Sequence, residues 1–356
     1  MARYLVTSTP FDFDSFRRRK TDGLGPEHVA ERLAVRLDAE IEQPVATPNL
    51  FDRLLGRLFA VPATWATART LSRRLRPGDL VYATGHDIGL ALALWTLARR
   101  SEALLAIYYV APDRPKERLL TALVTRLGPA TMAVAGTIEK VEFLRQRFPR
   151  LVDVVLADEQ TDIEFFAPHA DERPTHTAPL VASAGLEQRD YATFARAMEG
   201  LDADAHVCAV SPNFSDRTPV AMPDPVPERI TFGHLEFDEL RDLYRRAAVT
   251  VIPLLDNVYS AGLTVLMEAS ACGAPVVMTR TPGLAERFID DDLVIGVPPG
   301  DHEALRAAIL EVLHNPERAA ERAARARARI LERHTSDRYV DSLAVALERF
   351  QKEFQP

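Results

Sequence analysis

Cysteine is nearly absent from this chain: among its 356 residues only Cys208 and Cys272 are present. Both stand in apolar stretches, so they form no disulfide framework and no zinc-binding spacing. Such cysteine usage is typical of a reducing compartment. We therefore expect a cytoplasmic protein without structural disulfides.

Long apolar runs are missing as well. The longest, Gly89–Ala98, has about half the length that a membrane-spanning helix needs. The first residues, MARYLVTSTPF, contain too few apolar side chains for a secretory signal peptide. We expect neither a spanning segment nor a cleaved leader.

Basic residues form no long stripe interleaved with aromatic side chains, so nucleic acid is not an expected partner. The formal net charge of −8 is unevenly divided. Residues 1–160 carry 23 basic and 19 acidic groups, a balance of +4, and the remainder carries 20 and 32, a balance of −12. Two interpretations of Arg17–Lys20 and of the arginines in 53–76 stay open: peripheral contact with an anionic membrane, or a solvated basic surface.

The chain alternates apolar runs with helical patterns from end to end, which predicts an α/β fold with mainly parallel sheets. Helices are expected at 301–314, 316–333 and 336–354, and 48–76 is interpreted as two helical pieces broken at Pro62. Residues 158–179, rich in Pro, Asp and Thr, are the expected linker. The expected strands are Tyr4–Ser8, Leu80–Thr84, Leu104–Val110, Thr131–Ala135, Val152–Leu156, Leu180–Ser183, His206–Val210, Ile230–Phe232, Val249–Ile252 and Val276–Met278.

The most informative stretch begins with the apolar strand at 249–252. A polar loop follows, and then a helix is expected over Ala261–Ala271, with Ser260 placed to cap it and Cys272-Gly273 to end it. The helix N-terminus thus lies at the carboxyl end of a buried strand. Free N–H groups, the helix dipole and Gly262 make this corner suitable for a phosphate.

This stretch resembles the C-terminal half of family 4 (group 1) glycosyltransferases, which read E-x-F-G-L-x-x-L-E-A-M-A-C-G-x-P-V-V-A-T-x-x-G-G-x-x-E. The first glutamate of that pattern falls on Ser260, which is a departure. Looser matches at Asp162–Pro168, Gly25–Val29 and Asp79–Gly89 extend the resemblance over nearly the whole chain. The residues that match in register are Gly262-Leu263, Glu268-Ala269, Ala271-Cys272-Gly273, Pro275-Val276-Val277, Thr279, Gly283 and Glu286.

The resemblance implies the GT-B fold, with two Rossmann-like domains and a cleft between them. The expected division is an N-terminal, acceptor-side domain over 1–165 and a C-terminal, nucleotide-sugar domain over 166–335. A last helix, 336–356, would return to the N-terminal domain.

The resemblance also implies which residues bind the nucleotide sugar. Backbone groups of Ser260, Ala261, Gly262 and Leu263 would meet the diphosphate, and Glu268 would accept hydrogen bonds from ribose hydroxyls. Four further positions are expected to line the same site: Phe232, Gly233, Gly283 and Glu286.

A cation for the leaving phosphate is expected at Arg189. It falls on the lysine of the family motif G-R-L-x-x-x-K-G, and arginine adds bidentate geometry. The arginine of that motif falls on Ala184, so one of two phosphate cations is missing from its usual place.

On the acceptor side, Gly25 stands in a glycine loop that is one residue short. Tyr109 occupies the strand end where many family members carry a histidine. His86 and Asp87 are a nearby alternative, because the carboxyl ends of strands face the ligand in such folds. We take His86 as the candidate catalytic histidine, although a lone histidine in a loop is as often solvated.

Together these features predict transfer of a sugar from a nucleotide diphosphate to an unknown small-molecule, glycan or lipid acceptor, with retention of anomeric configuration. The expected catalytic residues are Arg189, Glu268 and His86. Two alternatives stay open: a nucleotide-sugar epimerase or glycosyl phosphorylase on the same fold, or a non-catalytic relative that binds a sugar nucleotide. The departures at Ser260, Ala184 and Tyr109 are the reason to keep the second.

No metal or other cofactor is expected. Asp12-x-Asp14 and Asp202-x-Asp204 spell the D-x-D of metal-dependent glycosyltransferases, but two acids at that spacing recur by chance. We interpret both pairs as surface acids. The nucleotide base, the sugar and the oligomeric state are not determined by the sequence.

Overall fold

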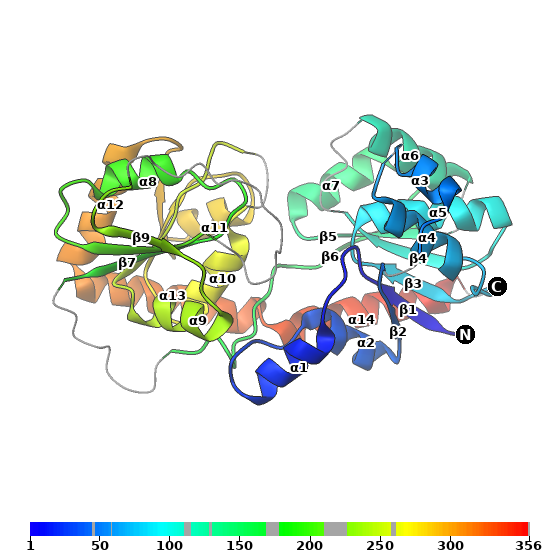
Figure 1. Cartoon of the computed structure of the whole chain (residues 1–356), viewed down its shortest axis with the longest axis horizontal. Coiled ribbons are helices and arrows are strands. Elements are labelled where there is room, and N and C mark those ends of the chain that lie inside the picture. Colours follow the sequence, from blue (N-terminus) through cyan, green and yellow to red (C-terminus); the bar gives the residue numbers. More distant parts are fainter. Residues whose placement is uncertain are drawn as a thin grey trace. The chain divides into compact units, whose positions relative to one another are not determined.

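The computed structural model describes residues 1–44, 47–57, 59–109, 115–127, 130–168, 178–209, 226–257 and 261–354 (Figure 1). The chain divides into two compact units. The first comprises Met1–Ser15, Glu27–Asp158 and Asp337–Pro356, and the second comprises Phe16–Pro26 and Glu159–Ser336. The stretch Phe16–Pro26 is thus grouped with the second unit, which no sequence pattern indicated.

A six-stranded parallel sheet in the order β2-β1-β3-β4-β5-β6 forms the centre of the first unit. Its strands are β1 (Arg3–Val6), β2 (Glu40–Glu42), β3 (Leu80–Ala83), β4 (Leu104–Tyr108), β5 (Thr131–Ala135) and β6 (Asp153–Leu156). Its helices are α2 (Val29–Leu37), α3 (Leu50–Leu55), α4 (Pro62–Leu71), α5 (His86–Arg99), α6 (Pro115–Leu127), α7 (Ile138–Arg147) and α14 (Ser336–Glu353).

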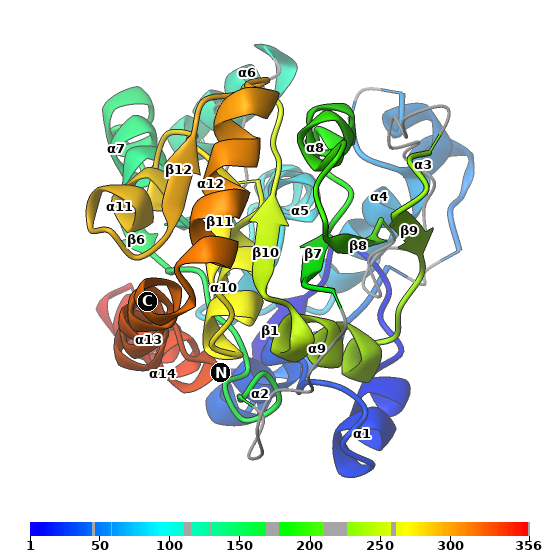
Figure 2. The same cartoon turned by 90° about the vertical axis from the view of Figure 1, so that its left-hand side faces the viewer.

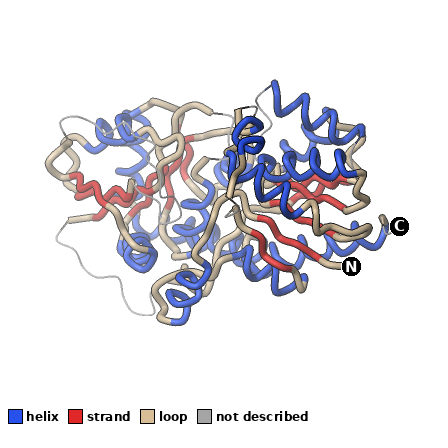
Figure 3. The backbone as a smooth tube through the Cα atoms, turned by 45° about the vertical axis from the view of Figure 1, so that its right-hand side comes forward, coloured by secondary structure: helices blue, strands red, loops and turns tan. Residues whose placement is uncertain are grey.

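Helices cover both faces of this sheet, because its strands are apolar on both sides. On one face Leu33 of α2 and Leu347 of α14 share a core with Leu5 of β1. On the other face α4, α5 and α7 pack against the sheet, where Trp65 and Ile107 are buried together. Figure 3 shows strands enclosed between helices in this way.

The second unit repeats the plan, with a parallel sheet in the order β12-β11-β10-β7-β8-β9. α8 and α12 cover one face, and Figure 2 shows α12 in front of β10 and β11. α9, α10, α11 and α13 contribute to the core of the other face. The strands are β7 (Leu180–Ala184), β8 (Asp204–Cys208), β9 (Ile230–Gly233), β10 (Val249–Ile252), β11 (Val276–Thr279) and β12 (Ile295–Val297). The helices are α1 (Phe13–Thr21), most of which belongs here, α8 (Tyr191–Met198), α9 (Phe237–Arg246), α10 (Leu263–Ala271), α11 (Leu284–Asp290), α12 (His302–His314) and α13 (Pro316–Arg333).

Every strand expected from the sequence is present within one or two residues, and β2 and β12 are additional. The expected start of the central helix was wrong. α10 begins at Leu263 with Gly262 as its N-cap residue, and Ser260, the expected cap, lies outside the described residues. Among the described helices, none combines the length and the apolar character that a bilayer crossing requires.

Candidate functional site

The N-terminus of α10 depends on a glycine. Gly262 has a φ of +81°, and a Cβ there would lie 2.8 Å from Cγ2 of Ile252 on β10. The first N–H to bond inside the helix is that of Leu266, which donates to the Gly262 carbonyl at 2.9 Å. The N–H groups of 263–265 therefore have no partner within the helix and carry its positive end. The backbone groups of Ala261 and Leu263 were also expected to meet the diphosphate. Both residues are buried.

The loop after β7 is joined to the end of β10, its neighbour in the sheet. The Leu255 N–H donates to Gln188 at 2.9 Å, and the Asp190 N–H donates to Pro253 at 3.0 Å. These two bonds pair Arg189 with Leu254. A Cβ added to Gly262 would contact the side chain of the same leucine. The structure therefore places Arg189 and the start of α10 around the same residue.

The Arg189 side chain is buried and fixed by carbonyl groups. Its Nε donates to the Ala184 carbonyl and its Nη1 to the Glu187 carbonyl, both at 2.8 Å. Gly185, at a φ of +100°, leaves the space that the guanidinium fills, since a Cβ there would lie 2.7 Å from Cζ. Burial lowers the pKa of Arg189 and the charge of Glu187 opposes this, but within the described ranges no carboxylate lies within ion-pairing distance of Arg189. A buried cation without a carboxylate is costly unless an anion binds there.

Glu268 is buried in the middle of α10. The Tyr244 hydroxyl of α9 donates to its Oε2 at 3.2 Å. Burial raises the pKa of Glu268 to about 8, and the bond from Tyr244 opposes this rise. The carboxyl is thus mostly protonated near neutral pH, and a ligand with hydroxyl groups would compete with Tyr244 for its oxygens.

Two predicted site residues follow β11: Gly283, whose backbone conformation is strained, and Glu286, whose carboxylate already has an ion-pair partner. Gly283, which precedes α11, has φ of 101° and ψ of −136°, a conformation for glycine alone. The Glu286 carboxylate is 46% exposed and lies 3.6 Å from Arg280 Nη1. In this structure Glu286 therefore interacts with Arg280, and contact with a sugar stays a prediction.

Phe232 and Gly233 end β9, the edge strand of the same sheet. The Phe232 ring meets the Tyr191 ring edge-on, with centroids 5.9 Å apart, and the Tyr191 hydroxyl donates to the Gly185 carbonyl at 2.7 Å. A chain of contacts thus connects this strand end to the loop that holds Arg189.

In the first unit, His86 and Asp87 open α5 directly after β3. The Ser8 hydroxyl donates to Asp87 Oδ1 at 2.7 Å, and His86 Nε2 lies 3.6 Å from Glu117 Oε2. The His86 ring is nearly parallel to that of Tyr109, with an interplanar angle of 10°. His86 Nδ1 is buried without a hydrogen-bond partner among the described residues, whereas Thr121 lies within hydrogen-bonding reach of the buried Tyr109 hydroxyl. Burial also raises the pKa of Tyr109.

Gly25 does not join this group within the first unit. It belongs to the second unit, where a Cβ at this position would lie 3.1 Å from Cβ of Arg19 and 3.6 Å from the ring of Phe237. Its acceptor-side role stays a prediction.

Four contact residues were not singled out from the sequence. Tyr244 and Gly185 lie within segments that resemble family motifs, which offered a weak signal for them. Ser8 and Glu117 contact Asp87 and His86 across long separations in the chain, for which the sequence carries no local pattern.

The described part of the chain contains no cluster of three His, Cys, Asp or Glu residues that could hold a metal ion. The two D-x-D pairs have other contacts. The Ser15 N–H donates to Asp12 Oδ1 at 3.0 Å, and Arg229 Nη1 lies 2.9 Å from Asp202 Oδ1 and 3.9 Å from Asp204 Oδ1.

Comparison with known proteins places the clearest similarity in the second unit. Residues 194–344 match the family model described as glycosyl transferase-like. A glycogen synthase of Mycobacterium tuberculosis is 37% identical over 98 residues, which is 28% of this chain and 23% of that protein. D-inositol 3-phosphate glycosyltransferase 2 of Catenulispora acidiphila is 42% identical over 93 residues, 24% of this chain and 21% of that protein. The chain thus spans about a quarter of the length of the curated relatives it matches.

Solved structures resemble the chain over almost its whole length. Sucrose-phosphate synthase of Thermosynechococcus elongatus has a TM-score of 0.74 at 16% identity, covering 99% of this chain and 100% of that one. The UDP-forming trehalose-phosphate synthase of Burkholderia vietnamiensis has a TM-score of 0.71 at 13% identity, covering 98% of each chain. Anabaena HepE, solved with UDP and glucose, has a TM-score of 0.64 at 14% identity, covering 98% of this chain and 100% of that one. Such low identities inform on the fold alone.

Proposed function

We propose that this chain, whose fold is GT-B and whose motifs are of the group 1 glycosyltransferase type, transfers a sugar from a nucleotide diphosphate to an acceptor. One observation carries the proposal. Arg189 is a buried cation without an ion-paired carboxylate in the described part, and it pairs with Leu254, whose side chain lies against Gly262 at the start of α10. This pairing of charge and helix dipole suits a diphosphate.

In the proposed reaction the bond between the anomeric carbon and the diphosphate breaks, and an acceptor oxygen takes the sugar. The leaving diphosphate gains negative charge, which Arg189 and the α10 N-terminus are placed to stabilise. Glu268 would hold the ribose hydroxyls and so fix the nucleotide in the site. We propose retention of configuration, as the resemblance implies, with positioning rather than a protein nucleophile supplying the rate enhancement.

For the acceptor, the proposal assigns the group formed by His86, Asp87 and Tyr109 at the carboxyl ends of the strands in the first unit. His86 Nδ1, which is buried without a hydrogen-bond partner among the described residues, and the Tyr109 hydroxyl are the polar atoms proposed to bond sugar hydroxyls. We propose a small-molecule, glycan or lipid acceptor and a cytoplasmic location. A solved relative, the trehalose-phosphate synthase of Burkholderia xenovorans, is in complex with glucose-6-phosphate, which favours a sugar-containing acceptor.

Calorimetry of the full chain with UDP, GDP, ADP and dTDP tests the proposal. We expect one nucleotide to bind clearly best, and at pH 9, where Glu268 is ionised, Glu268→Ala should weaken it by about 1.5–3 kcal/mol, the cost of a charge-assisted hydrogen bond. Glu321→Ala, a change of an exposed acid on α13, is the control and should bind like wild type. If no nucleotide diphosphate binds the folded protein, the proposal is wrong. Binding without sugar transfer to any acceptor would instead identify a non-catalytic relative.

A further inference from the structure

The short helix α3 presents apolar side chains to solvent. Leu50 is 83% exposed, Phe51 51% and Leu54 55%, and Val61, just before α4, is 59% exposed. Single exposed apolar residues are common on protein surfaces, but several on one helical turn mark an interaction site. The proposed transfer of a sugar does not use this helix.

The outward orientation of these side chains is built into the fold. Asp52 of α3 is fully buried, and its Oδ2 lies 2.8 Å from Nη2 of Arg69 on α4. Asn49 and Asp52 also form a reciprocal capping box at the helix start. Because this polar anchor fixes the inner side of α3, Leu50 and Leu54 cannot turn inward without breaking a buried ion pair.

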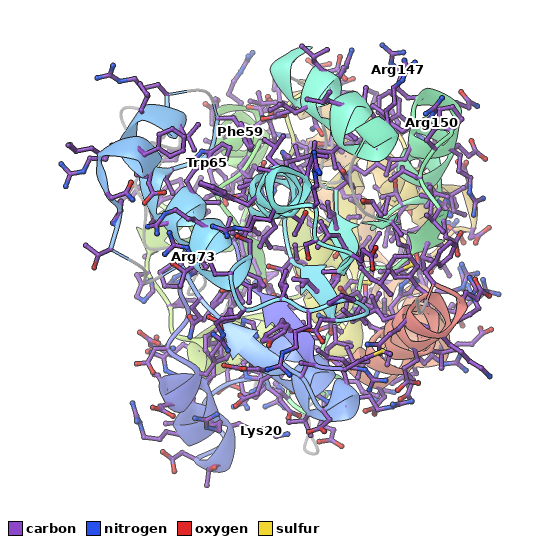
Figure 4. The ribbon with its side chains drawn as sticks, turned by 90° about the vertical axis from the view of Figure 1, so that its right-hand side faces the viewer. Lys20, Phe59, Trp65, Arg73, Arg147 and Arg150 are labelled. Atoms are coloured by element: carbon purple, nitrogen blue, oxygen red, sulfur yellow. The ribbon has the colours of Figure 1, made fainter. Side chains whose placement is uncertain are left out.

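The surroundings of α3 are basic. Residues 43–78 contain six arginines and a single acid, Asp52; Arg69 engages Asp52, and Arg74 pairs with Glu40 and Glu42. Arg53, Arg57 and Arg73 are exposed, and none has a carboxylate at ion-pairing distance within the part of the chain that the structure describes. Arg73 projects from the same side of the first unit as α3 (Figure 4).

The other basic segment of the sequence lacks this combination. Arg19 on α1 lies 3.0 Å from Glu236, so part of that charge is compensated. The phenylalanines of α1 are not exposed, since Phe13 is buried and Phe16 packs against the core of the second unit. Among the described residues, the segment around α3, unlike α1, combines exposed arginines that have no carboxylate at ion-pairing distance with exposed apolar side chains.

We propose that α3 docks the first unit onto an anionic lipid surface. Leu50, Phe51 and Leu54 would enter the boundary between head groups and acyl chains, and the flanking arginines would contact lipid phosphates. Side chains this exposed project from the surface, which suits a fluid boundary and needs no complementary pocket. A second copy of the chain on the same patch would bring like charges together, which disfavours self-association.

Sedimentation with lipid vesicles tests the proposal. The full chain should bind vesicles of phosphatidylcholine mixed with phosphatidylglycerol, release from them at high salt, and bind vesicles of phosphatidylcholine alone only weakly. The double change Leu50→Ser with Leu54→Ser should weaken binding by about tenfold or more, and each of Arg53→Gln and Arg57→Gln by about fivefold. Val35→Ser is the matched control, because Val35 is a 78% exposed apolar residue on α2 of the same unit.

Three results would overturn the proposal: no vesicle binding by wild type, equal binding to both vesicle types, or a loss of binding in Val35→Ser as large as that in the α3 variant. A dimer that the α3 changes dissociate would assign the patch to self-association instead. Nucleotide affinity should be unchanged in the α3 variants. A failure of vesicle binding would therefore not bear on the proposed sugar transfer.

Discussion

The Tyr244 hydroxyl of α9 donates a hydrogen bond of 3.2 Å to Glu268 Oε2 of α10, and both side chains are buried. This bond satisfies one oxygen of a carboxyl whose pKa burial raises to about 8. The group is therefore mostly neutral at pH 7 and becomes a stronger acceptor once it ionises.

Nucleotide binding should consequently depend on pH. If Glu268 accepts hydrogen bonds from ribose, affinity should rise by about fivefold as the pH increases from 7 to 9, because ionised acceptors bond more strongly than neutral ones. Calorimetry across this range measures the effect, and Glu268→Gln should give a flat profile. Parallel profiles for the two proteins would show that Glu268 does not bind the nucleotide.

The same carboxyl should make stability depend on pH. Between its ordinary pKa of 4.5 and its folded pKa of about 8, the folded state keeps a proton that the unfolded state has released. The free energy of unfolding contributed by this group therefore falls as the pH rises through that window. Relative to wild type, Glu268→Gln should gain about 2–4 kcal/mol between pH 5 and pH 9. Urea denaturation at both pH values checks this, and an unchanged difference would contradict the raised pKa.

Removing the buried cation should weaken ligand binding. Arg189→Met should lower nucleotide diphosphate affinity on the order of 10- to 100-fold, because a charge-assisted contact with phosphate is lost. Arg306→Met is the control, since Arg306 of α12 also donates to a backbone carbonyl, that of Ala197, at 3.1 Å. Equal effects of the two changes on calorimetric affinity would assign Arg189 a structural role only.

Sugar transfer or donor hydrolysis should survive EDTA, because Arg189 and the α10 N-terminus are proposed to carry the charge of the leaving group. Asp202→Asn should likewise leave the rate unchanged, as Asp202 pairs with Arg229. Loss of activity with chelator, restored by Mg²⁺ or Mn²⁺, would require a metal site that includes residues outside the described ranges.

Ser260 should affect the choice of donor sugar. In the resembling family a glutamate stands there, and serine is shorter, neutral and able to donate as well as accept. Ser260→Glu should shift preference from a sugar lacking a hydroxyl, such as a deoxysugar, towards common hexoses, with nucleotide diphosphate affinity nearly unchanged. A panel of nucleotide sugars measures this. Efficient use of a common hexose by wild type, unaltered in the variant, would end the specificity hypothesis.

The strands could be predicted because parallel strands buried on both faces are continuous apolar runs. The two that escaped prediction, β2 and β12, are edge strands of their sheets, and β2 carries Glu40 and Glu42. The position of Arg189 beside α10 followed from motif order along the chain. That no described carboxylate pairs with Arg189 could not be predicted, and neither could the bond between Tyr244 and Glu268, because such contacts depend on how separate helices and loops pack.

The close fit of Arg189 against Gly185 restricts how this loop can have evolved. The family motif has a leucine where this chain has Gly185 and a lysine where it has Arg189. A side chain at 185 and the guanidinium at 189 would occupy the same space. A lineage that starts from the motif must therefore replace the leucine before the arginine is tolerated. Once both changes are made, leucine cannot return at 185 while the guanidinium at 189 remains, so the order of the two changes is fixed in either direction.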